Sequence, residues 1–276
     1  MIIRQIALVS QTNRIEIDEL MNVAASLQKQ ITRDFIPIWK KKALISAFPN
    51  GRILPGYWPI FIRDDINEPG AAGFHTDRNQ QPFAMVQYSP SWSLTTSHEM
   101  LEMLADPYGN KLKLARSIMP NQGKVQYLVE ICDPSEDDQF AYDIQGVQVS
   151  DFYTPNYFDK LKIAGQRYSF TGAITEPLQI LPGGYLSWND PTTGDWWQAT
   201  FFGAKLKFTK LLGMKKLKTG SLRSRVDSLT NPPKTEHANL MMRAITDAPS
   251  AKLISKASAD YWEEEIQFVL KQYKKK

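Results

Sequence analysis

Cysteine and histidine are scarce in this chain of 276 residues, which contains one Cys and three His. The single thiol, Cys132, cannot form an internal disulfide, so a disulfide scaffold and a cysteine-rich zinc module are both excluded. No uninterrupted apolar run is long enough to span a bilayer. The first residues form a short apolar run without the small-residue cleavage site of a signal peptide, and we therefore expect a cytoplasmic protein without one.

Acidic residues are absent between Asp195 and Asp227, a stretch that holds eight Lys and Arg. Residues 1–202 carry 17 Lys and Arg against 22 Asp and Glu, a net charge of −5, whereas residues 203–276 carry 16 against 7, a net charge of +9. This asymmetry predicts a domain over 1–202 and a basic C-terminal extension over 203–276. A solvated extension and a segment, 203–226, that binds an acidic partner such as nucleic acid or a protein both fit the pattern.

Two further features belong to the basic extension. Aromatic side chains that would stack on nucleic-acid bases lie beside its lysines, namely Phe201, Phe202 and Phe208. Near the end, Asp260 and Glu263 have capping-box spacing and are followed by apolar residues at helical spacing. We therefore expect the chain to end in a helix that begins near Asp260.

Hydrophobic periodicity predicts an α+β protein. Apolar residues open the chain as a strand, and a helix follows from about Asp18 that should end before Pro37, because proline disfavours the α conformation of its predecessor. The segment Leu181–Phe202 is rich in Gly, Pro, Asp and Trp, so we expect it to be mostly loop. The other expected elements are strands at Trp58–Ile62, Phe83–Tyr88 and Lys124–Cys132, a helix at Ser93–Ala105, and short strands within Ala141–Val149 and Gly165–Phe170.

The helix expected over Ser93–Ala105 has one chemically active face. At 100° per residue, His98, Glu102 and Asp106 fall within an arc of about 80°, with Glu99 beside them. The opposite face is apolar and should pack into a core through Met100, Leu101 and Leu104. One side of this helix is therefore suited to binding a metal and the other to packing.

The pattern H-E-x-x-E follows the logic of the helical zinc motif H-E-x-x-H, with Glu102 in place of the second His. A His and a carboxylate one turn apart can hold a divalent cation, and Glu99, next to His98, can act as a base on water. Glu102 in place of a second His gives a harder ligand set of mixed nitrogen and oxygen donors; zinc still fits and is expected, and manganese or calcium become alternatives. A polar helix face without a metal, with Thr96–Glu99 as a capping box, explains the same residues.

A third ligand must come from elsewhere in the chain. The strand Lys124–Cys132 would end at Asp133 and carry Glu130 on its opposite face, so Asp133 is the preferred third ligand. Asp106 is the second choice, although it could instead cap the turn or accept a hydrogen bond from His98. The strand Phe83–Tyr88 would be the sheet edge that aligns a substrate.

Other polar residues carry weaker signals. We expect His75 to be a loop histidine bonded to Asp77, although it could line a cleft. Buried surroundings would make Cys132 an inert thiol, and His237 should be exposed. The acidic run 136–138 lacks the spacing of an EF-hand, so it is interpreted as solvated turn charge.

Several segments, in order, resemble a bacterial and phage family of zinc metallopeptidase-like, or zincin-like, proteins. They are SHEMLEMLADP, VEICDPSEDD and VSDFYTPNYF, with QKQITRDFIPIW and GFHTDRNQQPFAMVQY upstream and GGYLSWND downstream. The resemblance covers about residues 1–202. It implies a zincin-like mixed sheet with an N-terminal helix and an active-site helix, His98 and Glu102 as metal ligands, and Glu99 as the catalytic base.

These expectations combine into a zinc-dependent metallopeptidase that acts on a peptide or protein substrate, with Glu99 as general base and His98, Glu102 and Asp133 as ligands. The alternative is a non-catalytic structural or interaction protein on the same scaffold, for example a phage virion component. In that case the protein would reside in the virion, and the basic extension would dock on an acidic partner.

Overall fold

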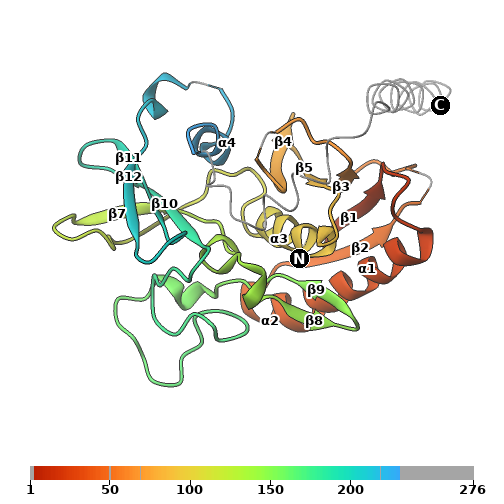
Figure 1. The fold of residues 1–276 in the computed structure, drawn as a ribbon, viewed down its shortest axis with the longest axis horizontal. Coiled ribbons are helices and arrows are strands. Elements are labelled where there is room, and N and C mark those ends of the chain that lie inside the picture. The colour runs from red at the N-terminus through yellow and green to blue at the C-terminus, as the bar shows by residue number, and fades with distance from the viewer. Residues whose placement is uncertain (1–2, 50, 69, 218, 231–276) are drawn as a thin grey trace.

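The computed structural model describes residues 3–49, 51–68, 70–217 and 219–230. Its elements form two five-stranded sheets, a small hairpin and the helices that pack on them, as Figure 1 shows. The α+β class and the N-terminal helix are confirmed. The helix expected near Asp260 and His237 both lie outside the described residues. No described helix is both long enough and apolar enough to cross a membrane.

The first sheet has the strand order β2-β1-β3-β5-β4 and is mixed. Its strands are β1 (Ile3–Ser10), β2 (Lys42–Ala47), β3 (Tyr57–Arg63), β4 (Gly73–Arg78) and β5 (Gln81–Gln87). All neighbours run parallel except β4, which pairs antiparallel with β5. The expectation that Phe83–Tyr88 forms the edge is wrong, because β4 pairs with β5 on that side and is itself the edge strand.

The N-terminal helix continues past Pro37, contrary to the sequence-based prediction. It runs as α1 (Ile17–Lys29), a π-helical turn (Gln30–Phe35) and α2 (Ile36–Trp39). Pro37 lies in the first turn of α2, where its missing N–H needs no partner, and the wider π turn carries the chain into it. The helix ends only at Lys40, which adopts a left-handed conformation with φ of 57°.

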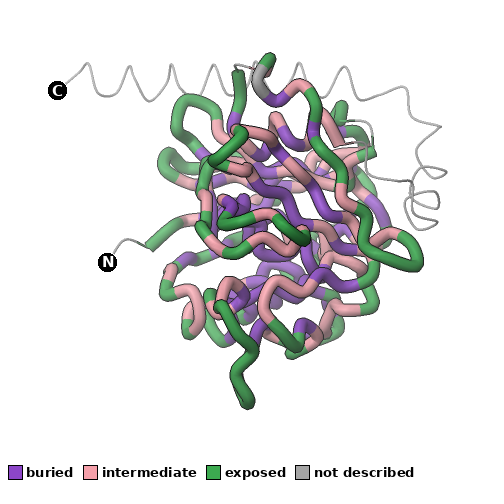
Figure 2. The backbone as a smooth tube through the Cα atoms, turned by 90° about the vertical axis from the view of Figure 1, so that its left-hand side faces the viewer, coloured by how far each residue is buried: buried purple, intermediate pink, exposed green. Residues whose placement is uncertain are grey.

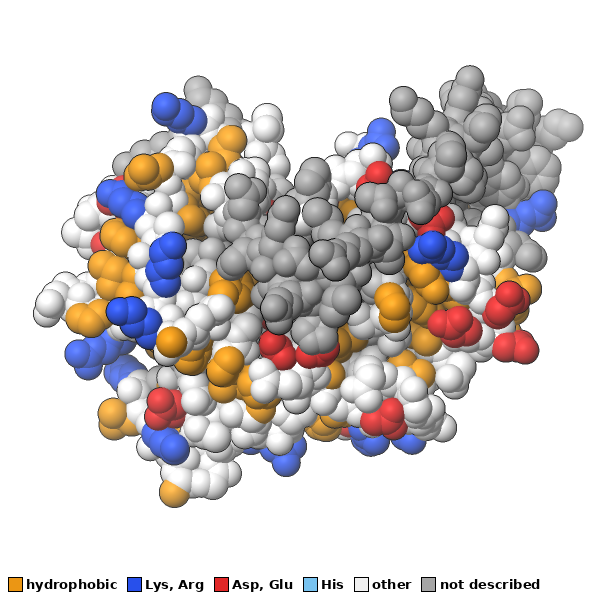
Figure 3. Space-filling model, in the orientation of Figure 1, with side chains coloured by type: hydrophobic (Ala, Val, Ile, Leu, Met, Phe, Trp, Pro, Cys, Tyr) orange, Lys and Arg blue, Asp and Glu red, His pale blue; other side chains and the backbone are white. Residues whose placement is uncertain are grey.

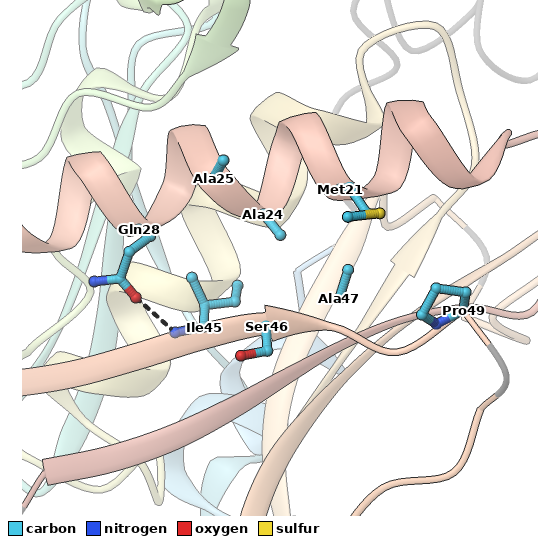
Figure 4. A pocket seen from close by; sticks show the side chains of 8 residues that line it. All are labelled: Met21, Ala24, Ala25, Gln28, Ile45, Ser46, Ala47 and Pro49. Carbon is cyan, nitrogen blue, oxygen red and sulfur yellow. Dashed lines mark hydrogen bonds between the residues drawn. The ribbon is translucent and has the colours of Figure 1, made fainter.

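Side chains of α1 pack on the sheet and also protect its edge. Leu20, Val23 and Leu27 are buried at helical spacing against the core. Gln28 accepts a hydrogen bond at 2.9 Å from the backbone N–H of Ile45 on the edge strand β2, as the dashed line in Figure 4 shows. This contact satisfies a donor that an edge strand would otherwise present to another chain. The hollow drawn in Figure 4 between α1 and β2 is shallow and mostly apolar.

The second sheet is antiparallel, with the order β12-β11-β10-β7-β6. Its strands are β6 (Leu112–Arg116), β7 (Lys124–Leu128), β10 (Tyr185–Asp190), β11 (Asp195–Thr200) and β12 (Lys207–Lys210). The loop expected over Leu181–Phe202 is therefore largely the hairpin β10–β11. Aromatic pairing across the sheet, with Trp188 opposite both Trp197 and Tyr127, outweighs the turn residues of that segment.

The strand expected over Lys124–Cys132 is shorter than the alternation indicates, since β7 ends at Leu128. The chain then leaves the sheet and enters a 3₁₀ turn, Asp133–Ser135. Residues 129–132 remain buried although they belong to no strand. Because the regular pleat is lost after Leu128, alternation no longer determines where Glu130 and Asp133 point.

The buried segments gather in the middle of the molecule, as Figure 2 shows. The main core joins the first sheet, α1 and one face of the second sheet to helix α3 (Trp92–Ala105). The hairpin of β8 (Tyr142–Ile144) and β9 (Val147–Val149) packs on both α1 and α3. The short strands expected within Ala141–Val149 are thereby confirmed, whereas Gly165–Phe170 contributes only a bridge between Ser169 and Tyr153.

The described part of the basic extension packs on the body of the protein. Strand β12 adds to β11, and helix α4 (Leu222–Asp227) follows. A second apolar cluster holds this segment on the outer face of the second sheet and consists of Leu128, Trp196, Leu211, Met214 and Val226. The boundary at residue 202 remains a prediction, but β12 shares a sheet with residues that precede that boundary, and Leu211, Met214 and Val226 share an apolar cluster with them.

Positive charge on the second sheet comes from both sides of that predicted boundary. In Figure 3, Lys and Arg side chains gather on the side of the molecule formed by β7, β11 and β12. The exposed ones on the strands of this sheet are Lys113, Arg116, Lys124, Lys207 and Lys210. The aromatic residues expected to stack on nucleic acid, Phe201, Phe202 and Phe208, are all partly buried, with Phe208 against Trp188 and Phe202 against Tyr185.

Helix α4 docks on the turn that follows α3. The backbone N–H of Arg223 donates to the carbonyl of Gly109 at 2.9 Å, and that of Leu222 donates to the side chain of Asn110 at 2.8 Å. Gly109 has φ of 57°, and a Cβ there would lie 2.9 Å from the Cβ of Arg223 and from Oγ of Ser221. Only glycine fits this approach, so the turn after α3 fixes the position of α4.

Gly109→Ala should destabilise the protein and loosen α4, because the new methyl group meets two side chains in addition to the backbone strain. We expect a loss of about 2–5 kcal/mol in the free energy of unfolding, measured by urea denaturation. The matched control is Gly146→Ala, which also has positive φ but no atom within 4 Å of the new Cβ. It should lose only about 1–2 kcal/mol of strain energy. Equal losses in the two variants would contradict the tight docking.

Candidate metal centre

Helix α3 carries the motif and is held in place at both faces. Its apolar face enters the core as expected, with Met100, Leu101 and Leu104 buried. The capping-box interpretation of Thr96–Glu99 is wrong, because the helix begins at Trp92 and these residues lie in its middle.

A buried polar network fixes the rotation of α3 about its axis. Ser97 donates from Oγ to Oε1 of Gln30 at 2.8 Å and accepts from the backbone N–H of Ser150 at 2.9 Å. Gln30 in turn donates to the carbonyl of Ser150 at 3.0 Å and belongs to the π-helical turn. Because Ser97 precedes His98, these bonds hold the motif in register with the rest of the site.

The three residues expected to bind a metal lie together. Nε2 of His98 is 3.4 Å from Oε1 of Glu102 and 3.3 Å from Oδ1 of Asp133. The His98 side chain is 13% exposed, and the two carboxylates are fully buried. Asp133 thus reaches the polar face of α3 as expected, but it lies in a turn and not at the end of a strand.

Cys132 couples this turn to the helix. Its backbone N–H donates to Oε1 of Glu102 at 3.1 Å, and its thiol donates to the carbonyl of His98 at 3.8 Å. Burial raises the pKa of the Cys132 thiol well above its ordinary value, as expected for an inert buried thiol.

Asp106 plays a different part from Asp133. Its Oδ2 accepts a hydrogen bond at 2.6 Å from the backbone N–H of Lys111, which closes the turn after α3. Its carbonyl accepts from Nε2 of His75 at 3.1 Å. The alternative that Asp106 caps the turn therefore agrees with the geometry, and its carboxylate does not face His98.

His75 is a buried residue of the edge strand β4 and not a loop histidine bonded to Asp77. Its Nδ1 lies 3.4 Å from Oε2 of Glu99 and 3.8 Å from Oε2 of Glu102. Burial opposes protonation of this ring, but the bond to Glu99 and the charge of Glu102 outweigh it and raise the pKa of His75. The candidate base Glu99 is thus buried and paired with a histidine that the motif alone did not identify.

Two more acidic residues join the site. Glu130 was expected on the opposite face of a strand from Asp133, yet carboxylate oxygens of Glu102, Glu130 and Asp133 lie within 4.8 Å of one another. Glu136, interpreted as solvated turn charge, is only partly exposed and forms a similar group with His98 and Asp133. Both differences follow from the loss of strand geometry after Leu128, which turns the chain back over α3.

Arg223 was not anticipated from the sequence. It enters the acidic cluster from α4 with a side chain that is 10% exposed. Its Nη1 lies 2.8 Å from Oε2 of Glu130, 3.0 Å from Oδ2 of Asp133 and 3.5 Å from Oε2 of Glu102. The only sequence signal was the absence of acidic residues around it, which does not distinguish Arg223 from its basic neighbours.

The charges of these buried groups depend on one another. Burial alone would lower the pKa of His98, but the charge of Glu102 and the bonds to Asp133 and Glu102 raise it well above its ordinary value. Burial opposes ionisation of Glu102, yet the charge of His98 keeps the pKa of that carboxyl well below its usual range. Burial raises the pKa of Asp133 to about 6 and that of Glu130 well above its ordinary value.

The residues fit a divalent cation in two respects. Buried oxygens of Glu102, Glu130 and Asp133 receive no hydrogen bond, although buried polar atoms are normally satisfied. The donors are one imidazole nitrogen and several carboxylate oxygens, a set that suits zinc or manganese. His98, Asp133 and Glu136 place ligand atoms within 4.8 Å of one another, and Oε1 of Glu102 lies 3.4 Å from Nε2 of His98. His98, Glu102 and Asp133 would hold the ion, with Glu136 as a further carboxylate beside it.

Comparison with protein-family models, with curated proteins and with solved structures finds no match. The function of this centre is therefore inferred from its own geometry. That geometry brings together the four residues expected from the motif and the turn, His98, Glu99, Glu102 and Asp133, and adds His75 and Arg223.

Asp133→Asn should weaken metal binding far more than Asp106→Asn, since Oδ1 of Asp133 faces His98 whereas Asp106 bonds Lys111. We expect Asp133→Asn to lower Zn²⁺ affinity more than about 100-fold, because even residues that only orient a ligand cost about 10–100-fold. Asp106→Asn should stay near the wild-type affinity. Competition with a chromophoric chelator measures both, and the reverse order would make Asp106 the third ligand.

Proposed function

We propose that this protein is a metal-dependent hydrolase, with zinc as the metal and a peptide or protein as the substrate. One observation carries the proposal. Nε2 of His98 lies within 3.4 Å of two carboxylates from separate parts of the chain, and Glu99 follows His98 on the same helix. Residue types and spacing of this kind serve zinc-dependent hydrolysis.

The arrangement of the first sheet supports the zincin-like interpretation. Strand β4 has an antiparallel pairing with β5 on one side, and no described strand pairs with its other side. It packs against α3 and contributes His75 to the site. An extended peptide could add to this free edge by backbone hydrogen bonds. The edge role proposed for Phe83–Tyr88 thus passes to Gly73–Arg78.

The chain supplies a base and the means to orient it. Zinc held by His98, Glu102 and Asp133 would supply Lewis acidity and lower the pKa of a water molecule. Glu99 would take the proton of the attacking water and return it to the leaving amine. Nδ1 of His75 lies 3.4 Å from Oε2 of Glu99 and orients that carboxylate. Gly73 lies next to the same carboxylate and has no side chain to displace it, because a Cβ at this position would lie 3.0 Å from Oε1 of Glu99.

A non-catalytic metalloprotein is the second candidate, and the burial of the site favours it. Glu102 and Asp133 are inaccessible, and the most exposed of the three ligands, His98, exposes only 13% of its side chain. Structural zinc sites are closed to solvent, whereas catalytic sites keep an open position. On this proposal the protein is an interaction component, for example of a phage virion, and the basic side of the second sheet contacts an acidic partner.

Glu99→Gln should separate the two candidates. If Glu99 is the base, the variant should keep its zinc and lose about 10²–10⁴-fold in the hydrolysis of fluorescent casein or quenched peptides. The control is Glu19→Gln, the same change at a residue that accepts a 2.9 Å bond from the indole of Trp92 at the start of α3. It should retain activity.

Three results decide this test. Hydrolysis that survives Glu99→Gln excludes Glu99 as the base. A wild-type protein that binds about one zinc and is stabilised by it, but hydrolyses no peptide, supports the structural candidate. A protein that binds no divalent metal contradicts both.

A further inference from the structure

The guanidinium of Arg223 meets the same carboxylates as His98 but at different oxygens. In Glu102, Oε1 lies 3.4 Å from Nε2 of His98 and Oε2 lies 3.5 Å from Nη1 of Arg223. In Asp133, Oδ1 lies 3.3 Å from the same histidine nitrogen and Oδ2 lies 3.0 Å from the same guanidinium nitrogen. Each carboxylate therefore has one oxygen toward His98 and the other toward Arg223.

The position of the guanidinium is fixed by further contacts that involve no metal ligand. Nε of Arg223 lies 2.9 Å from Oδ1 of Asp227, one turn along α4, and Nη2 donates to the hydroxyl of Tyr185 at 3.0 Å. Its backbone N–H is bonded to Gly109 at the end of the turn after α3. A guanidinium that is held at two points, on a helix whose backbone is also anchored, can in turn hold the groups that it contacts.

We propose that Arg223 is a positioning residue of the metal centre, which orients Glu102 and Asp133 so that their other oxygens face the ion beside His98. This inference rests on the proposed metal centre. It makes Arg223 a partner of the metal rather than its competitor, because the oxygens that it holds are not those that face His98.

Charge balance agrees with this assignment. Glu102, Glu130 and Asp133 form an acidic group whose oxygens converge on Nη1 of Arg223. Arg223 supplies one positive charge beside this group, and a divalent ion beside His98 would supply two more. Without Arg223, Glu130 and Asp133 would lose the guanidinium that lies within 3.0 Å of each, and a buried carboxylate without a cationic partner is costly in a protein interior.

The inference gives part of the basic extension a role. Arg223 lies beyond residue 202, and the cluster of Leu128, Trp196, Leu211, Met214 and Val226 presses its helix against the second sheet. A segment that looked like an addition to the metalloprotein domain thus completes its metal centre.

Arg223→Gln in the full chain tests the proposal, with Co²⁺ as the probe. We expect Co²⁺ affinity to fall about 10–100-fold and the visible d–d spectrum of the bound ion to change, because Glu102 and Asp133 lose their orientation. The matched control is Arg225→Gln on the same helix, whose guanidinium donates to the carbonyl of Leu217. It removes the same charge and should bind Co²⁺ with wild-type affinity and spectrum.

A second variant keeps the test decisive if the loss of a buried cation harms folding. Arg223→Gln combined with Glu130→Gln replaces the guanidinium together with the carboxylate nearest to it by neutral amides and should fold, as shown by circular dichroism. The positioning role still predicts weaker Co²⁺ binding and an altered spectrum in this double variant, since Oδ2 of Asp133 loses its donor and Oε2 of Glu102 loses its ion pair. Wild-type affinity and spectrum would show that only charge matters and would overturn the proposal.

The remaining outcomes are equally informative. Tighter Co²⁺ binding by Arg223→Gln would make Arg223 a competitor of the metal and overturn the inference. Unchanged binding would overturn it too, while leaving the proposed hydrolase intact. A wild-type protein that binds no Co²⁺ would reject the metal centre itself, and with it both proposals.

Discussion

The burial of several carboxylates in one small volume is the constraint on which the rest of this structure depends. Glu102 and Asp133 are inaccessible to solvent and Glu130 nearly so, and removing that much negative charge from water is unfavourable without nearby cations. His98 meets the carboxylates from one side and Arg223 from the other. Each of these groups would be costly alone, and together the opposite charges offset part of that cost, although several carboxylate oxygens still receive no hydrogen bond.

Three separate parts of the chain must meet for this balance to exist. Helix α3 brings His98 and Glu102, the turn after β7 brings Asp133, and α4 brings Arg223. Each part is held by packing of its own. The network around Ser97 orients α3, the bond from Cys132 to Glu102 ties the turn to the helix, and the second apolar cluster holds α4. Local stability thus supports the position of each ligand.

The sequence predicted the elements with a clear period and the chemistry with a clear spacing. The helix at Ser93–Ala105 and the polar face with His98, Glu99 and Glu102 follow from 3.6-residue geometry, and the structure contains both. The predictions of helix ends and loops were wrong where the preferences of single residues, such as proline or turn formers, were outweighed by contacts with distant parts of the chain. Pro37 did not end the first helix, because a π turn carried the chain past it, and Trp188 paired across a sheet in a segment that its turn residues marked as loop.

The sequence by itself determined which residue types could form a metal site, since a His, two Glu and an Asp with these spacings are local facts. Only the tertiary structure decided which of them meet. Asp133 rather than Asp106 reaches His98 because β7 ends early and the chain turns back over α3. His75 and Arg223 join because a strand edge and a docked helix lie against that face. These contacts span up to 121 positions of sequence, from Glu102 to Arg223, and no hydrophobic period or short motif predicts a contact between residues so far apart in the chain.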